Sequence, residues 1–239
     1  LDHTVRVWDI TSGTCLRVME KHEGPVHGVA VTPDGRFVIS ASADKTVRGW
    51  DLATGRLVDG MYDGTSNAHN AVVVTADGVV VSASYRALFV RDGLGRVAPR
   101  KLELHGKDVT TVAVTPDGRQ AVSGGEDKTV CLCDLATGTR VRTFEGHAKT
   151  VTAVVVTPDG RHMISGSDDG TARIWDLATG HCRRTFDSDF RVESLAVTPD
   201  GGRALVGGSD GRTQVWELCL GATDWAAPMQ LCRPTAQDD

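Results

Sequence analysis

The feature that most constrains this chain is a repeat of about 42 residues that runs through most of its 239 residues. The phrase Trp-Asp-Leu-Ala-Thr-Gly ends at Gly55 and returns to end at Gly180, and Cys-Asp-Leu-Ala-Thr-Gly ends at Gly138. The positions equivalent to its Trp lie 41 or 42 residues apart, at Trp8, Trp50, Arg91, Cys133, Trp175 and Trp216. A Thr-x-Asp-Gly turn recurs at nearly the same spacing, starting at Thr32, Thr75, Thr115, Thr157 and Thr198. Two markers with one period predict an array of similar structural units.

Each unit has the pattern of four short strands. Residues 151–156 are almost continuously apolar, and the turn Pro158-Asp159-Gly160 follows them. Pro sets φ in such a turn, and Gly supplies the positive φ that it needs. Further strands are predicted over 161–167, 171–177 and 181–186. Because a small antiparallel sheet cannot bury both of its faces alone, the units must stack on one another. The sequence therefore predicts an all-β fold of four-stranded antiparallel blades.

The chain resembles the WD-repeat (WD40) family of β-propellers over roughly residues 1–218. The Trp-Asp end of each unit, the pair Gly146-His147 and the period carry the resemblance. In that family a His, a Ser or Thr, an Asp and the Trp form a buried hydrogen-bonded set. The matching residues are His22, Ser40, Asp44 and Trp50 in one repeat, His105, Ser123 and Asp127 in another, and His147, Ser165, Asp169 and Trp175 in a third.

Several repeats depart from this pattern. Cys133 replaces the Trp in one repeat, Thr65 stands where a His is expected in another, and Ser188 does so in the last. These departures predict weaker blades in the same fold. A Ser-His-Asp catalytic triad is not indicated, because the three residue types recur and an enzyme does not need several copies of one active site.

The repeat count predicts five nearly complete blades, near residues 22–62, 65–104, 105–144, 147–186 and 188–218, with residues 1–20 as strands of a further blade. Either residues 16–20 or the tail, through residues 225–233, would supply the fourth strand of the last blade. The rest of 219–239 is expected to be disordered. Seven blades would need nearly 300 residues, so we expect an open or truncated ring, with a closed ring of five or six blades as the alternative. The chain starts without Met inside a strand pattern, which suggests a fragment.

The resemblance also implies binding positions on one rim of the propeller. These positions are Pro25, His27, Ala43, Ala68, Asn70, Tyr85, Asp108, Thr110, Glu126, Thr150, Thr152, Asp168, Arg191, Glu193 and Ser209. Tyr85 and Arg191 are the expected anchors, because Tyr and Arg are enriched in binding hot spots. The four acidic positions favour a basic protein or peptide partner. An open ring would also favour self-association, because it leaves apolar sheet faces uncovered.

Composition limits the alternatives. The net charge of −5 disfavours binding to nucleic acid or lipid headgroups, although residues 91–107 are locally basic. The six cysteines form no Cys-x-x-Cys pair, so neither a metal site nor a cofactor is expected, and a reducing intracellular location, cytoplasmic or nuclear, is favoured. There is no apolar run of 18 residues and no signal-peptide pattern, so no membrane association is expected.

The expected function is therefore that of a non-catalytic scaffold for protein–protein interactions, which could be a regulatory segment of a larger signalling protein. An enzyme built in the channel of a propeller is the main alternative. It would need an unrepeated cluster of His, Asp or Glu that converges on the axis. The histidines outside the repeat markers, His3, His69, His162 and His181, show no such pattern.

Overall fold

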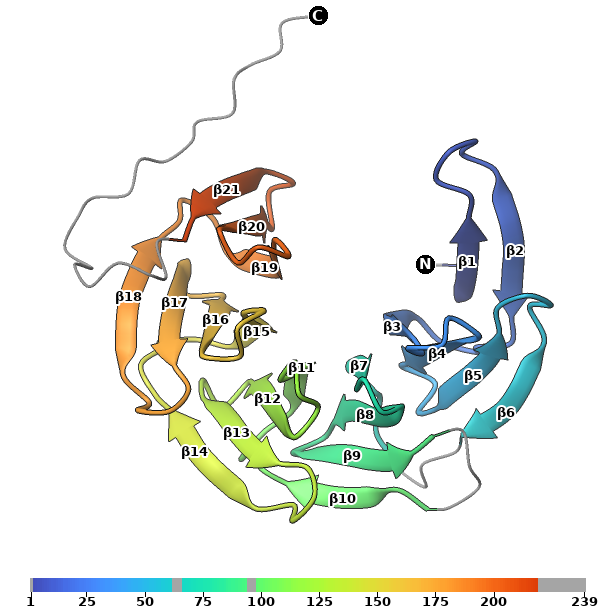
Figure 1. Ribbon diagram of the computed structural model, residues 1–239, viewed down its shortest axis with the longest axis horizontal. Coiled ribbons are helices and arrows are strands. Elements are labelled where there is room, and N and C mark those ends of the chain that lie inside the picture. Colours follow the sequence, from blue (N-terminus) through green and yellow to red (C-terminus); the bar gives the residue numbers. More distant parts are fainter. Residues whose placement is uncertain (1, 62–65, 94–97, 219–239) are drawn as a thin grey trace, which may run out of the picture.

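The computed structural model describes residues 2–61, 66–93 and 98–218, which form an arc of small sheets (Figure 1). Every regular element in these ranges is a β-strand, and within each sheet every strand pairs antiparallel with its neighbours in sequence. The predicted all-β propeller of antiparallel blades is therefore confirmed. In the same ranges, no helix is long and apolar enough to cross a membrane.

The arc contains four complete blades, one blade with three strands and one sheet with two. The N-terminal sheet pairs β1 (Thr4–Trp8) with β2 (Cys15–Glu20). Blade 1 is β3 (Val26–Val31), β4 (Phe37–Ser42), β5 (Val47–Asp51) and β6 (Leu57–Met61). Blade 2 is β7 (Ala71–Val74), β8 (Val79–Ser84), β9 (Ala87–Asp92) and β10 (Arg100–Glu103).

Blade 3 is β11 (Val109–Val114), β12 (Gln120–Gly125), β13 (Val130–Asp134) and β14 (Arg140–Phe144). Blade 4 is β15 (Val151–Val156), β16 (His162–Ser167), β17 (Thr171–Asp176) and β18 (Cys182–Asp187). Blade 5 is β19 (Val192–Val197), β20 (Arg203–Gly208) and β21 (Thr213–Glu217). The predicted closing strand in residues 225–233 and the tail 219–239 lie outside the described residues.

Local polar contacts fix the turns that connect the strands. In blade 4 the Thr157 hydroxyl donates to Asp159 at 2.5 Å, and the backbone N–H of Arg161 donates to the same carboxylate oxygen at 3.0 Å. Gly160, between them, has a φ of 67°, which glycine adopts without strain. The Thr-Pro-Asp-Gly phrase thus sets the register of β15 against β16.

The hydrophobic core lies between blades rather than within them. Val122 and Leu132 of blade 3 pack with Met163 and Trp175 of blade 4. The first strands of blades 2, 3 and 4 each bury a valine against the preceding blade, and Val112 is only 7% exposed in this position. The equivalent Val29 in blade 1 is 57% exposed, because the N-terminal sheet lacks the two inner strands that would cover it.

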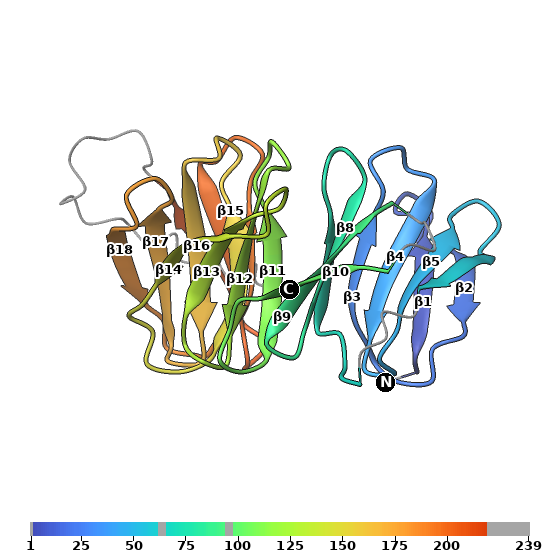
Figure 2. The same ribbon diagram turned by 90° about the horizontal axis from the view of Figure 1, so that it is seen from below.

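At the other end of the arc, blade 5 is also left partly uncovered. Leu205 of blade 5 is 39% exposed, whereas the equivalent Ile164 of blade 4 is fully buried against blade 5. In Figure 1 the β1–β2 sheet and the β19–β21 sheet stand at the two ends of the arc, and the described residues do not close the ring. Figure 2 shows the blades side by side, with their turns at two opposite ends. The predicted open arrangement is therefore what the described residues form.

Arginines on the outer strands link neighbouring blades, a role that the sequence analysis did not anticipate. Arg142 on β14 donates to the carbonyl oxygens of Ala178 and Thr179, at 2.8 and 3.1 Å. Arg100 on β10 bonds the carbonyl oxygens of Leu135 and Ala136 in the same way. Arg17 on β2 donates twice to the carbonyl oxygen of Ala53. In each case the acceptor is the Asp-Leu-Ala-Thr-Gly turn of the next blade, so this recurring arginine stabilises the stack.

Candidate functional site

The recurring His, Ser, Asp and Trp residues form one chain of hydrogen bonds in blades 1 and 4. In blade 4, Trp175 Nε1 donates to Ser165 Oγ at 2.8 Å, and Ser165 Oγ lies 2.7 Å from His147 Nε2. His147 Nδ1 lies 3.0 Å from the carboxylate of Asp169. Blade 1 repeats the chain through Trp50, Ser40, His22 and Asp44, with distances of 2.8, 2.7 and 2.7 Å. A neutral imidazole with its proton on Nδ1 satisfies every donor and acceptor in this chain.

Blade 3 has a shorter version of the same set. His105 contacts Ser123 at 2.8 Å and Asp127 at 3.1 Å, but Cys133 occupies the Trp position. Burial raises the pKa of the Cys133 thiol to about 11, so this sulfur stays protonated at pH 7 and is a poor nucleophile. In blade 2, Arg91 takes the Trp position, and the residue at the His position, Thr65, lies outside the described residues.

Burial and hydrogen bonds set the charge states of these groups. Burial alone would raise the pKa of Asp169, but hydrogen bonds from Thr171, the Ala148 backbone N–H and His147 outweigh it and lower the pKa to about 2. Asp44 behaves in the same way, with a pKa of about 2. Burial lowers the pKa of His147 and of His22 below the ordinary value of about 6.5. The sets of blades 1 and 4 therefore hold a carboxylate and a neutral imidazole at pH 7.

The geometry excludes these sets as catalytic triads. Ser40, Ser123 and Ser165 are fully buried, so their hydroxyl groups cannot meet a substrate. Each hydroxyl is also occupied by its His, and in blades 1 and 4 by its Trp. The sets satisfy buried polar groups that would otherwise be costly to desolvate, and their role is architectural.

We expect Ser165→Ala to lower the free energy of unfolding by about 2–3 kcal/mol, because it leaves both the Trp175 N–H and the His147 Nε2 without a buried partner. Ser123→Ala, which removes only the bond to His105, should cost about 1–2 kcal/mol. Urea unfolding followed by circular dichroism measures both. An equal loss in the two variants would show that the Trp bond contributes nothing.

The predicted rim residues lie on the side of the arc that carries the turns between the second and third strands of the blades, such as the turn between β4 and β5. We call this side the hairpin end. In four blades a backbone hydrogen bond joins two of them, from residue 43 to 25, 126 to 108, 168 to 150 and 209 to 191, at 2.9–3.0 Å. Each blade thus presents a small cluster of neighbouring predicted positions. The hairpin of blade 2 is shorter and carries Tyr85 and Arg86, and the Arg86 guanidinium lies 5.9 Å from the Tyr85 ring centre.

Three predicted rim residues are occupied by contacts between blades. The amide of Asn70 donates to the Val109 carbonyl at 2.8 Å. The hydroxyls of Thr110 and Thr152 donate to the carbonyls of Val151 and Val192. Each side chain therefore bonds the backbone of the next blade, which leaves it less available to a partner. His27 and Glu193, at the equivalent positions near the two ends, are exposed.

The acidic rim residues and the anchors remain available. Across the described ranges, no hydrogen bond or ion pair involves the carboxylates of Asp108, Glu126, Asp168 and Glu193, or the guanidinium of Arg191. Tyr85 is 47% exposed. Lys107 and Lys128 lie on the same loops as Asp108 and Glu126, so the charge of this rim is mixed in blade 3.

The described residues of the basic stretch near 91–107 do not form a patch. Arg91 is buried, Arg100 binds the backbone of blade 3, and Lys101 pairs with Glu103 at 2.6 Å. Arg96 lies outside the described residues. Across the described part of the chain, no group of three or more His, Cys, Asp and Glu side chains is placed to hold a metal ion.

Comparison with known protein families agrees with this geometry. The family described as "WD domain, G-beta repeat" matches residues 13–51, 98–134, 138–176 and 180–217, and the chain belongs to this WD40 family. Proteins of this family generally serve as non-catalytic scaffolds for protein interactions. Residues 52–97, which hold the first three strands of blade 2, fall between the matched repeats. Blade 2 is therefore the blade that departs most from the family pattern.

Individual relatives match only short segments. The chain is 47% identical over 36 residues to the mouse (Mus musculus) F-box-like/WD repeat-containing protein TBL1X, a match that covers 15% of this chain and 7% of that protein. It is 41% identical over 44 residues to the Nuclear distribution protein PAC1 of Coccidioides posadasii (strain C735), covering 18% and 9%. These matches span less than a tenth of the relatives' length, about one repeat.

Proposed function

We propose that this chain is a non-catalytic scaffold that binds protein or peptide partners through the hairpin end of its blades. The observation that carries the proposal is a difference between the recurring and the variable polar residues. The recurring ones are buried and bonded to one another, as in the set around Ser165. Several variable ones on the hairpin end, including Asp168 and Arg191, make no side-chain bond within the described residues.

Tyr85 and Arg191 are the proposed anchors of the interface. Tyr85 presents an exposed aromatic ring on the blade that departs from the repeat, and Arg191 presents an unbonded guanidinium on blade 5. Large amphipathic and guanidinium side chains contribute most of the binding energy in typical interfaces. The unbonded carboxylates of Asp108, Glu126, Asp168 and Glu193 favour a basic partner by charge complementarity.

The cysteines support an intracellular location as part of the proposal. All four cysteines in the described ranges are free thiols, with Cys15 and Cys182 exposed and Cys131 and Cys133 buried. Exposed free thiols are typical of proteins kept in a reducing compartment. Cytoplasm and nucleus both meet this condition.

Affinity capture with quantitative mass spectrometry tests the rim. We expect Tyr85→Ala and Arg191→Ala each to reduce the recovery of the captured partners by about tenfold, as hot-spot truncations worth over 1 kcal/mol do. The matched controls are Val141→Ala, since Val141 is also 47% exposed but lies on the outer strand β14, and Arg36→Ala at the opposite end of blade 1. Unchanged recovery with both rim variants would show that the partner binds elsewhere.

A further inference from the structure

Blade 2 departs from the repeat on the side of the arc opposite the hairpin end, in the turn between β7 and β8. In blades 1, 3 and 4 the backbone N–H of the turn threonine bonds a carbonyl five residues later, as from Thr157 to His162. In blade 2 the bond from Thr75 reaches Val79, only four residues later. The residue that blade 2 lacks is an arginine in these three blades, at Arg36, Arg119 and Arg161, and a glycine, Gly202, in blade 5.

The side chain that follows the shortened turn is also small. Val79 pairs with Asp92 across β8 and β9. In blades 1, 3 and 4 the residue that pairs with the equivalent aspartate is larger, namely Phe37, Gln120 and His162. A cleft of about 540 Å³ opens here between blades 2 and 3. Val79, Val90 and Leu135 supply its apolar part.

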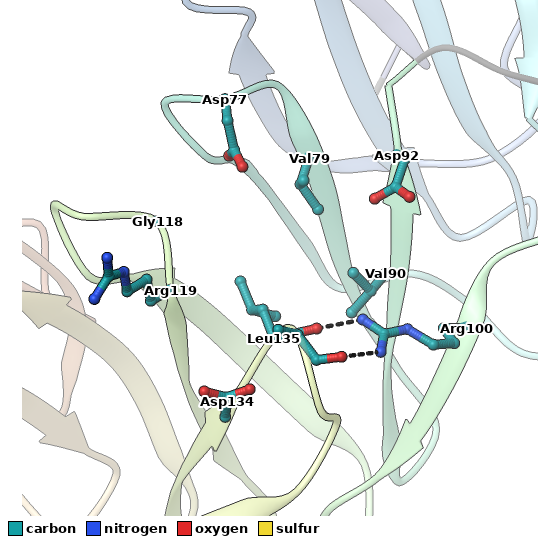
Figure 3. A pocket seen from close by; sticks show the side chains of 10 residues that line it. Asp77, Val79, Val90, Asp92, Arg100, Gly118, Arg119, Asp134 and Leu135 are labelled. Atoms are coloured by element: carbon teal, nitrogen blue, oxygen red, sulfur yellow. Dashed lines mark hydrogen bonds between the residues drawn. The ribbon is translucent and has the colours of Figure 1, made fainter.

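Two carboxylates of blade 2 line this cleft on either side of Val79, as Figure 3 shows. Both Asp77 and Asp92 are exposed. Asp77 accepts a bond from the Thr75 hydroxyl through one oxygen, and Asp92 has no side-chain bond to any described residue. Three carboxylate oxygens therefore remain available to a ligand.

Blade 1 shows what the missing arginine does at the equivalent pair, Asp34 and Asp51. Hydrogen bonds from Thr32 and the Arg36 backbone lower the pKa of Asp34, and the charge of Arg36 lowers it further. For Asp51, hydrogen bonds from Thr54 lower the pKa, and the charge of Arg36 again adds to the effect. The charge of one arginine thus acts on both carboxylates in blade 1, and the turn of blade 2 has no arginine at this position.

The other charged groups that line the cleft do not pair with Asp77 or Asp92. Arg100 uses its guanidinium to bond the carbonyl oxygens of Leu135 and Ala136. Arg119, on the blade 3 side, points away from Asp92 in Figure 3. Asp134 accepts hydrogen bonds from Thr137 on one oxygen and adds a third negative charge to the lining.

We propose that this cleft binds a lysine or arginine side chain of a protein or peptide partner, which takes the place of the arginine that blade 2 lacks. The aliphatic stem lies on Val79 and Val90, as long cationic side chains do on apolar surface. The cationic head pairs with Asp77 and Asp92. The cleft is separate from the hairpin end proposed above as the main interface, so each site can fail its own test.

The probe is a set of capped tripeptides titrated into ¹⁵N-labelled protein and followed by amide chemical shifts. Acetyl-Gly-Lys-Gly-amide and acetyl-Gly-Arg-Gly-amide are the ligands, and acetyl-Gly-norleucine-Gly-amide is the uncharged control. We expect saturable shifts at the amides of Val79, Val90 and Leu135 with the two cationic peptides, with a Kd of roughly 1–10 mM. The norleucine peptide should give none.

Two variants test the pairing. Asp92→Asn keeps the shape of an exposed side chain and removes its charge, and we expect it to weaken binding by about fivefold or more. Insertion of an arginine between Gly78 and Val79 restores the turn length of the other blades and should abolish binding. Asp168→Asn, at the hairpin end, is the matched control and should leave the shifts unchanged.

The outcomes separate this inference from the proposed function. Shifts confined to the hairpin end, or scattered over the surface and unaffected by Asp92→Asn, would overturn the cleft assignment. No saturable shift with either cationic peptide would also overturn it. Neither result bears on the capture experiment with Tyr85→Ala and Arg191→Ala, which tests the hairpin end.

Discussion

Replacing Trp175 with alanine is expected to lower the free energy of unfolding by about 3–5 kcal/mol, the usual cost of truncating a buried aromatic side chain. Trp175 is only 3% exposed, and its ring meets that of Phe144 of blade 3 edge-on at a centroid distance of 5.6 Å. Its N–H donates to Ser165. The substitution therefore removes contacts between two blades and also leaves a buried hydroxyl with one partner fewer.

Trp8→Ala is the matched control for this prediction. Trp8 holds the equivalent position in the N-terminal sheet, but it is 51% exposed, because this sheet lacks the two inner strands of a complete blade. We expect a loss of about 1 kcal/mol or less. Urea unfolding of both variants, compared by midpoint and slope, measures the difference. If the two substitutions cost the same, Trp175 does not occupy the core position described above.

Acidification should destabilise the protein progressively from about pH 6.5 to about pH 2. Asp44 and Asp169 have folded-state pKa values of about 2, below the ordinary value near 3.9. A carboxyl group with a lowered folded pKa contributes stability above its unfolded pKa, and this contribution is lost as the pH falls through the folded value. Each aspartate should contribute about 2 kcal/mol at pH 7 and lose it between about pH 5 and pH 2.

The buried histidines also make the folded protein less stable as the pH falls, but at higher pH than the aspartates do. Because the pKa of His22 and His147 is lowered in the folded state, the unfolded chain takes up protons first as the pH falls below about 6.5. Their contribution is present above that pH and is lost below it. Unfolding free energies measured at intervals from pH 7.5 to pH 2.5 should therefore fall throughout.

The double variant Asp44→Asn/Asp169→Asn is the control for the acid effect. It should be less stable than the parent at pH 7, and its stability should change less between pH 5 and pH 2. A parent protein whose stability is flat from pH 7 to pH 3 would contradict the hydrogen-bonded carboxylates described here.

Much of the fold could be predicted because the architectural residues recur. The period, the Thr-x-Asp-Gly turn and the Trp position each recur in several blades, so one altered residue such as Cys133 does not hide the pattern. The hydrogen-bonded set around Ser165 could be anticipated for the same reason. The open arc followed from the strand count, since residues 1–20 supply only the two outer strands of a blade.

Contacts between blades could not be predicted from one chain's pattern. Thr110 and Thr152 resemble exposed rim residues in sequence, yet their hydroxyls bond the neighbouring blade's backbone. Which side chain reaches across depends on the spacing of adjacent first strands, which the repeat does not encode. The role of Arg142 and its equivalents was missed for the same reason.

The cleft of blade 2 did have a signal in the sequence. Thr75-Ala76-Asp77-Gly78-Val79 lacks one residue compared with Thr115-Pro116-Asp117-Gly118-Arg119-Gln120. A search for motifs detects what recurs, and a deletion of one residue leaves both markers intact.

The central claim is that recurring side chains hold the arc together while variable ones are free to recognise partners. Asp168 and Asp169 are neighbours that differ in this respect. Asp169 bonds His147, Thr171 and the Ala148 backbone, whereas the carboxylate of Asp168 bonds none of the described residues. The most direct test is the free energy of unfolding, at pH 7, of Asp169→Asn against Asp168→Asn. We predict a loss of about 1–3 kcal/mol for Asp169→Asn and a change within about 0.5 kcal/mol for Asp168→Asn. Equal effects at the two positions would contradict the claim.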